Sequence, residues 1–269
     1  MQTTMLDGLT VAYEEAGGGD APPQLQVHGF TGGRDDFDPV LELLAEDRRV
    51  VAVDLPGHGG SEGPDDAGSY GLAALAGWVL ALADLLDLGE VHLLGHSFGG
   101  LVAQRAAAVG SQRMRSLVLM GTGLGAPREE RSAHAVRIAL AARDHGPEAA
   151  LQTALTTNPD GEQQASAEER EAALRRYRGL RTAAIVGTAR SLVSATPLGA
   201  FLRGIDIPVL VLHGEDDRVW LGNEQLLLVA SVAGAEHVVV PGAGHQPQRD
   251  DPRRWAAIVN AFLRRADED

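Results

Sequence analysis

Short runs of apolar residues alternate with helix-like segments along most of this chain, and this alternation strongly constrains its fold. The predicted strands cover residues 25–27, 50–54, 91–94, 116–120, 207–213 and 235–240. Helical spacing of apolar residues is found at 36–46, 70–88, 101–109 and 252–264. Strands that alternate with helices in this way form βαβ units, which wind right-handedly into a parallel sheet with helices on both faces. The chain is therefore predicted to be an α/β protein.

Two segments depart from this alternation. Residues 9–15 alternate loosely between apolar and polar side chains before a run of three glycines, which predicts an early antiparallel strand or hairpin. Between residues 124 and 206 the strand pattern disappears, and Ala- and Arg-rich helical segments are punctuated by prolines. We therefore expect a core domain formed by residues 1–123 and 207–269, with residues 124–206 inserted as a helical cap.

The charge and the missing residue types remove several functional classes. The 269 residues have a formal net charge of -14, and the 23 basic residues are all arginines without a basic stripe, so no nucleic acid partner is expected. The absence of lysine and cysteine excludes Schiff-base chemistry, thiol nucleophiles, disulfides and thiolate metal sites. No stretch resembles a secretion signal or a membrane span, so a cytoplasmic protein without a membrane partner is expected.

The pattern Gly-x-Ser-x-Gly occurs twice and offers two candidate nucleophiles, Ser61 and Ser97. This pattern can place a serine on a strained turn between a strand and a helix, whose free amides point toward the site. Ser97 lies between a predicted strand and an Ala-rich predicted helix, whereas Ser61 is followed by Pro64 and two aspartates. The context favours Ser97. The alternative is that Gly95 and Gly99 merely permit close packing of the helix on the sheet.

Five motifs follow predicted strands in a fixed order. They are HGF at 28–30, DLPGHGGS at 54–61, GHSFGG at 95–100, HGEDD at 213–217 and GAGH at 242–245. With these motifs the chain resembles the α/β-hydrolase superfamily over essentially its whole length. The resemblance implies the α/β-hydrolase fold, with a mostly parallel eight-stranded sheet, helices on both faces and an inserted helical cap. It also implies a serine hydrolase whose triad runs in the order serine, acid, histidine.

The family pattern assigns Asp217 and His245 as the partners of Ser97. In the motif Gly-x-x-Asp the fourth position carries the acid, which selects Asp217; the adjacent Asp216 is the alternative, and Glu215 is less favoured. His245 lies in a glycine-rich turn after the last predicted strand, from which it can act as general base and then general acid. Most of the nine histidines are expected to be structural and none has metal-ligand spacing, so no metal and no cofactor are expected.

The same resemblance implies an oxyanion hole formed by two backbone amides. One belongs to Phe98, directly after the nucleophile, and the other to Phe30 in the loop after the first predicted parallel strand. The Phe30 side chain is an expected substrate contact, with ordinary packing as the alternative. His96, which precedes the nucleophile, is the second expected substrate contact.

A serine at the elbow predicts hydrolysis of a carboxylic ester, thioester or lactone through an acyl-enzyme. The substrate is expected to be a small molecule with a small to medium acyl group, because the cap shows no continuous apolar surface. The cap arginines Arg128, Arg131 and Arg137 are candidates for binding an anionic substrate, although arginines on exposed cap helices are usually solvated. The oligomeric state is left open by the sequence.

The loop motifs at 28–32 and 54–61 are also similar to the succinyl-hydroxycyclohexadiene-carboxylate synthase of menaquinone biosynthesis. That lyase uses the same triad to abstract a proton, so a lyase is the alternative function. The synthases commonly carry an arginine directly after the elbow glycines, where this chain has Leu101. A non-catalytic ligand receptor on the same fold and a cofactor-free perhydrolase are further alternatives, because a fold alone does not establish an activity.

Overall fold

The computed structural model describes residues 1–158 and 167–268. In this part of the chain, eight strands form one sheet in the order β1-β2-β4-β3-β5-β6-β7-β8. The strands are β1 (Gln2–Leu6), β2 (Leu9–Ala16), β3 (Ala21–Val27), β4 (Arg48–Val53), β5 (Val91–His96), β6 (Met114–Met120), β7 (Val209–Gly214) and β8 (Glu236–Val240). The pairs β1/β2 and β2/β4 are antiparallel and the other pairs are parallel. The predicted mostly parallel, eight-stranded sheet is confirmed.

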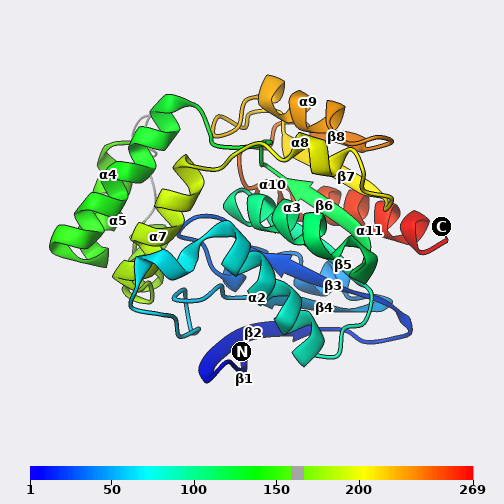
Figure 1. The fold of residues 1–269 in the computed structure, drawn as a ribbon, viewed down its shortest axis with the longest axis horizontal. Coiled ribbons are helices and arrows are strands. Elements are labelled where there is room, and N and C mark those ends of the chain that lie inside the picture. The colour runs from blue at the N-terminus through cyan, green and yellow to red at the C-terminus, as the bar shows by residue number, and fades with distance from the viewer. Residues whose placement is uncertain (159–166, 269) are drawn as a thin grey trace.

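Helices cover both faces of this sheet (Figure 1). They are η1 (Arg34–Phe37), α1 (Leu41–Leu44), η2 (Ala67–Tyr70), α2 (Leu72–Leu85), α3 (Phe98–Gly110), η3 (Ser111–Arg113), α9 (Gly222–Ala230), α10 (Pro247–Asp250) and α11 (Pro252–Glu268). Along β5 and β6, Leu93 and Leu117 belong to the core beneath α2 and α3, whereas Leu94 and Val118 belong to the core beneath α1 and α11. This is the period of two expected of strands that are buried on both faces.

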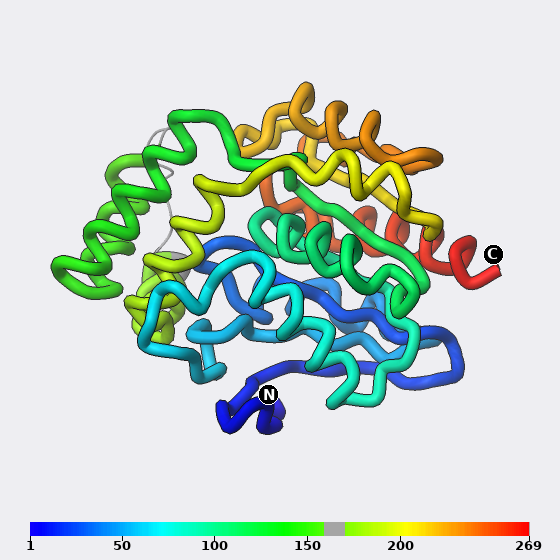
Figure 2. Tube along the Cα trace, in the orientation of Figure 1, coloured from blue at the N-terminus to red at the C-terminus, as the bar shows by residue number. Residues whose placement is uncertain are grey.

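A further group of helices lies between β6 and β7. It consists of α4 (Glu129–His145), α5 (Pro147–Thr156), α6 (Ala167–Arg178), α7 (Thr182–Val193) and α8 (Gly199–Leu202). α4 packs against both α5 and α7, and the three lie together at one end of the sheet (Figures 1 and 2). Side chains from this segment share a small core of their own: Ile138, Ala142, Ala150, Leu151, Tyr177, Leu180 and Ile185. These helices occupy the segment expected to form a cap, of which residues 159–166 lie outside the described residues.

Several predicted elements have different bounds in the structure. The helix expected at 36–46 is wrong: Pro39, which has no amide hydrogen to donate, separates η1 from α1. The helix expected at 70–88 is shorter, because Asp87 adopts a left-handed conformation with a φ of 52°. β1 and α9 are not among the elements predicted from the sequence. No described helix has the length and apolar character needed to cross a bilayer.

Candidate active site

Ser97 lies at the point where β5 ends and α3 begins. Its φ of 53° is in the left-handed region, which residues other than glycine rarely adopt. The Ser97 amide donates a hydrogen bond of 2.8 Å to the carbonyl of Met120 on β6, which ties the turn to the neighbouring strand. The serine therefore stands at the N-terminus of α3, where free amides and the helix dipole favour negative charge.

Gly95 and Gly99, on either side of this turn, leave no room for a side chain. A Cβ on Gly95 would lie 2.3 Å from the carbonyl oxygen of Gly99, and a Cβ on Gly99 would lie 2.3 Å from the carbonyl oxygen of Val27. The backbones of β5, α3 and β3 therefore touch here. The glycines therefore permit close packing of the helix on the sheet and also the strained turn at Ser97. A role of the motif in packing is compatible with its role in holding a nucleophile.

Ser61, in the second copy of the pattern, has a different environment. Its hydroxyl donates a hydrogen bond of 2.7 Å to the carbonyl of Asp54 and accepts one of 2.9 Å from the amide of Ala12. The residue is buried in the loop after β4, and no helix begins there. Ser61 thus joins that loop to β2. Its hydroxyl already donates one hydrogen bond and accepts another within the protein.

His245 and Asp217 form a hydrogen-bonded pair. The imidazole Nδ1 lies 3.1 Å from Oδ1 and 3.0 Å from Oδ2 of Asp217. Asp217 is buried, and its Oδ1 also accepts hydrogen bonds from the amides of Val219 and Trp220 at 2.8 and 3.2 Å. Burial by itself would raise the pKa of Asp217, but His245 and these amides outweigh burial and lower it. The carboxylate therefore stays ionised and can orient the imidazole.

Asp216 and Glu215, the alternative acids, lie elsewhere. Asp216 is exposed, and among the described residues no hydrogen bond or ion pair joins its carboxylate to His245. Glu215 is also exposed and accepts a hydrogen bond of 3.0 Å from the amide of Gly242. The geometry thus brings Asp217 to the imidazole and leaves its two neighbours at the surface.

The loop after β3 carries the amide of Phe30 close to Ser97. A Cβ built on Gly29 would lie 3.1 Å from Cβ and 3.5 Å from Oγ of Ser97, so this backbone lies directly against the nucleophile. His28 holds the loop: its Nε2 accepts a backbone amide at 3.0 Å, so its Nδ1 carries the proton and donates to the Gly29 carbonyl at 2.8 Å. Among the described residues, the amides of Phe30 and Phe98 donate no hydrogen bond. Both can serve a ligand oxygen.

His96, an expected substrate contact, is buried beside His245, with the ring centres 4.8 Å apart. Its Nε2 donates a hydrogen bond of 2.9 Å to the His245 carbonyl. Burial, and then the nearby His245, lower the pKa of His96 to about 3, so the ring is neutral at physiological pH. His96 therefore supports the backbone of His245 and also lines a cavity beside Ser97.

Two cavities meet at the serine and the imidazole. One, of about 160 Å³, has a polar lining that includes Asp36 and Arg176. The other, of about 220 Å³, lies between the core and the α4–α7 helices and has apolar walls that include Ile138 and Leu192. The residues that line both cavities are Phe30, Thr31, Ser97, Tyr177 and His245. A substrate with a polar part and an apolar part fits this arrangement.

The polar cavity contains an ion-pair cluster that was not among the residues predicted to form the site. Arg176 on α6 lies 2.9 Å from Oδ1 of Asp36 and 2.7 Å from Oδ2 of Asp35, just after the Phe30 loop. The next residue, Tyr177, has its hydroxyl 3.3 Å from the hydroxyl of Thr31. α6 is thereby tied to the loop that carries the Phe30 amide. The adjacent aspartates were the only sequence signal, and they do not reveal a partner that is 140 residues away.

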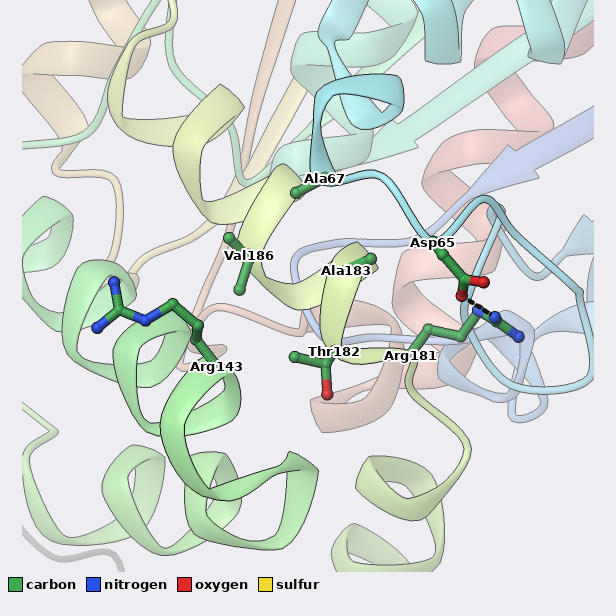
Figure 3. A pocket seen from close by; sticks show the side chains of 7 residues that line it. All are labelled: Asp65, Ala67, Arg143, Arg181, Thr182, Ala183 and Val186. Carbon is green, nitrogen blue, oxygen red and sulfur yellow. Dashed lines mark hydrogen bonds and ion pairs between the residues drawn. The ribbon is translucent and has the colours of Figure 1, made fainter.

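A larger cavity, of about 570 Å³, lies apart from these residues (Figure 3). Ala183 and Val186 of α7 line it together with Arg143, which is 59% exposed, and Arg181, which pairs with Asp65. None of the three predicted triad residues reaches it. Within residues 1–158 and 167–268, no group of three or more His, Cys, Asp or Glu side chains is arranged to hold a metal ion. The two smaller cavities are therefore the candidate active site.

No hydrogen bond joins Ser97 Oγ to His245 among the described residues. Catalytic hydrogen bonds are often long without substrate and tighten in the complex. Both side chains line the same two cavities, and the imidazole is 23% exposed while its carboxylate partner is buried. The arrangement places around one space a hydroxyl, an oriented imidazole and two backbone amides that have no partner among the described residues. These are the groups that acyl transfer requires.

Residues 22–252 match the α/β hydrolase fold family, and the chain belongs to this family. It is 30% identical to the putative 2-succinyl-6-hydroxy-2,4-cyclohexadiene-1-carboxylate synthase of Bacillus subtilis, over 97% of both chains. Among solved structures it is similar to a hydrolase from Pseudomonas aeruginosa PA01, with 28% identity over 97% of both chains and a TM-score of 0.83. A thermophilic esterase from Thermogutta terrifontis has 25% identity over 98% of this chain and 97% of its own, with a TM-score of 0.81.

Two other curated relatives are much longer than the matched segment. These are dihydrolipoyllysine-residue acetyltransferase components of acetoin cleaving systems, and the match spans 33% and 30% of their lengths. The chain thus spans about a third of these proteins. The family match and the two structural neighbours, a hydrolase and an esterase, support a hydrolase.

Proposed function

We propose that this protein hydrolyses a carboxylic ester, thioester or lactone of a small to medium acyl substrate, with Ser97, His245 and Asp217 as its triad. One observation carries the proposal: a strained serine at a helix N-terminus and a carboxylate-bound imidazole line the same two cavities. The esterase and hydrolase neighbours support the same reaction class.

The reaction begins with attack of Ser97 Oγ on the substrate carbonyl. His245 Nε2 takes the hydroxyl proton, and Asp217, bonded to Nδ1, stabilises the resulting imidazolium. The amides of Phe30 and Phe98 donate to the oxyanion that develops on the carbonyl oxygen. Such preorganised donors contribute on the order of 10²- to 10³-fold in rate for each one.

The second half of the reaction reuses the same groups. The imidazolium protonates the leaving alcohol or thiol as the tetrahedral intermediate collapses to an acyl-enzyme. His245 then removes a proton from water, which attacks the acyl carbonyl and releases the acid from Ser97. The lowered pKa of Asp217 keeps a negative charge beside the imidazole through both halves.

A lyase is the second candidate, and the full-length similarity to the Bacillus subtilis synthase favours it. In that reaction His245 would remove a proton from substrate carbon, and no acyl-enzyme would form. Leu101, at the position where such synthases commonly have an arginine, lies on α3 with its side chain buried in the hydrophobic core. This position therefore offers no charge to a substrate carboxylate, so hydrolysis is the preferred proposal.

Labelling with a fluorophosphonate, followed by peptide mass mapping, tests the nucleophile and is run beside hydrolysis of short-chain p-nitrophenyl esters. We expect the label on Ser97 and ester turnover that Ser97→Ala abolishes. Ser61→Ala is the matched control, because it alters the other copy of the motif. Labelling of Ser97 without ester turnover would favour the lyase or a receptor, and a label on Ser61 would overturn the proposed triad.

A further inference from the structure

His134 on α4 lines the 220 Å³ cavity together with Ser97 and His245. The ring is half-buried, and its Nδ1 lies 3.1 Å from the hydroxyl of Thr157. That hydroxyl has a single hydrogen, which it donates to the carbonyl of Thr153 at 2.8 Å. Thr157 can therefore only accept a hydrogen bond from the imidazole. It follows that Nδ1 carries the proton of the neutral ring and that Nε2 carries a lone pair.

The Nε2 atom of His134 has no hydrogen-bond partner in the described part of the chain. Because Nδ1 is bound within the cap itself, Nε2 is the nitrogen that this side chain offers to a ligand. In the neutral ring this atom is an acceptor. A cavity whose walls include Ile138 and Leu192 thus also has one hydrogen-bond acceptor.

The charges around His134 keep its ring neutral. Arg131, three residues earlier on α4, is 8% exposed and lines the same cavity, so the expectation that the cap arginines are solvated is wrong for this residue. Its guanidinium is held within the protein and donates a hydrogen bond of 3.2 Å to Asn158. Burial, and then the charges of Arg131 and Arg137, lower the pKa of His134 from its ordinary value. Nε2 therefore remains an acceptor at neutral pH.

Trp220 has a second unpaired polar atom beside the same cavity. Its side chain lines the cavity and is buried, and its indole Nε1 has no hydrogen-bond partner among the described residues. A Cβ on Gly123 would collide with Cε3 and Cζ3 of the indole, so that edge packs against backbone and Nε1 belongs to the opposite edge. A buried donor without a partner is unfavourable, and a ligand oxygen would relieve this cost.

We propose that the substrate's acyl group carries a hydroxyl that donates a hydrogen bond to Nε2 of His134, which makes His134 a specificity-determining residue. The inference rests on the proposed ester hydrolysis. A hydroxyl also accepts, so its oxygen can receive the Nε1 hydrogen of Trp220. An acyl chain without a hydroxyl would displace water from both groups and leave them unpaired. A site built to bind a hydroxyl rejects such an analogue.

Two pairs of p-nitrophenyl esters test this proposal, and in each pair a methyl group replaces the hydroxyl. Both enantiomers of 3-hydroxybutanoate are compared with 3-methylbutanoate, and 6-hydroxyhexanoate is compared with heptanoate. The longer pair approaches the limit of the cavity, which would hold roughly seven groups of about 30 Å³ each. The uncatalysed rate of each ester is subtracted. We expect kcat/KM to favour the hydroxy ester in at least one pair.

In that pair, His134→Phe should lower the ratio of kcat/KM for the hydroxy ester to that for the methyl ester by about five- to tenfold, the effect of one neutral hydrogen bond. His134→Gln should restore part of the ratio, because its amide oxygen can accept in place of Nε2. His145→Phe is the matched control, since it removes a histidine from the exposed last turn of the same helix and should leave both ratios unchanged.

Thermal unfolding and the rate of Ser97 labelling are measured for each variant to establish that the fold and the nucleophile are intact. An unchanged ratio in His134→Phe, or a wild-type protein that favours neither hydroxy ester, would overturn the inference, while turnover of the methyl esters upholds the hydrolase. Turnover of none of these esters would instead overturn the proposed function, and the inference with it.

Discussion

Two arrangements of serine, histidine and aspartate lie at opposite ends of the same sheet. The first consists of Ser97, His245 and Asp217, and follows the carboxyl ends of the parallel strands. The second consists of Ser116, His92 and Asp267, and lies toward the amino ends of β5 and β6 with the end of α11. The residue types are the same, but the surroundings differ in every respect that matters for catalysis.

In the second arrangement each of the three side chains is hydrogen-bonded to another, and the serine and the histidine are closed to solvent. His92 Nδ1 lies 2.7 Å from the hydroxyl of Ser116, and Nε2 lies 2.9 Å from Oδ1 of Asp267. Both His92 and Ser116 are fully buried, and Arg48 binds the other carboxylate oxygen at 2.9 Å. A substrate cannot reach this serine, so the group joins the C-terminal helix to the sheet.

The first arrangement is open where the second is closed. Its serine has a strained backbone, lies beside two backbone amides that donate no hydrogen bond within the described part of the chain, and borders two cavities. Its carboxylate binds Nδ1 of the imidazole and leaves Nε2 for the reaction, whereas in the buried group the carboxylate binds Nε2. Accessibility and the choice of ring nitrogen, rather than residue type, therefore separate a candidate catalytic triad from a structural one.

The largest expected effect separates the two serines. Ser97→Ala should reduce kcat/KM for a p-nitrophenyl ester by about 10⁴-fold or more, because it removes the attacking atom. Ser116→Ala should keep most of the activity and lower the free energy of unfolding by about 1 kcal/mol, the contribution of one hydrogen bond. Steady-state kinetics and urea unfolding measure the two effects. Loss of turnover in Ser116→Ala with an intact fold would contradict the structural role of the second arrangement.

The next effect distinguishes the acids. Asp217→Asn should lower kcat by roughly 10³- to 10⁴-fold, because an amide cannot stabilise the imidazolium or hold its reactive tautomer. Asp216→Asn, the matched control at the adjacent exposed position, should stay within about threefold of wild type, as surface substitutions usually have small effects. Equal losses in the two variants, measured by steady-state kinetics, would reassign the acid.

A smaller effect concerns Asp267, the carboxylate of the second arrangement. Asp267→Asn should leave kcat nearly unchanged but destabilise the fold by roughly 2 to 4 kcal/mol, because it leaves the buried guanidinium of Arg48 without one of its charged partners. Arg48 keeps a second ion pair with Asp47 at 3.1 Å, which limits the loss. Urea unfolding midpoints measure it. A variant as stable as wild type would show that the buried group does not hold α11 in place.

The smallest effect is a change in pH dependence. Burial, and then the charge of Arg48, lower the pKa of His92 to about 4 from an ordinary value of 6.5. Between these values the unfolded chain binds a proton that the folded chain does not, so this histidine makes stability fall as the pH falls from about 6.5 to about 4. His92→Asn should reduce that slope by up to about 1.4 kcal/mol per pH unit. Unfolding free energies across this range measure it, and an unchanged slope would contradict the assignment.

Much of the core architecture was predictable because its signals lie in contiguous residues. The apolar runs of β4 to β8 and the glycine-rich motifs after them indicate the parallel sheet, and a strand-turn-helix context is present around Ser97 but not around Ser61. The spacing of apolar residues predicted helix bounds less well where a single residue changes the backbone conformation. Pro39 interrupts one expected helix and Asp87 shortens another.

The sequence by itself therefore determined the fold family, the elbow and the small set of candidate catalytic residues, since periodicity and turn chemistry are local properties. Only the tertiary structure decided which acid meets His245, which cap arginine is buried, and which second histidine is locked between strand and helix. His92 and Asp267 are 175 residues apart and meet only because α11 docks on the sheet. Contacts of this kind depend on how whole helices and strands pack against one another, and this packing cannot be inferred from any single segment of the chain.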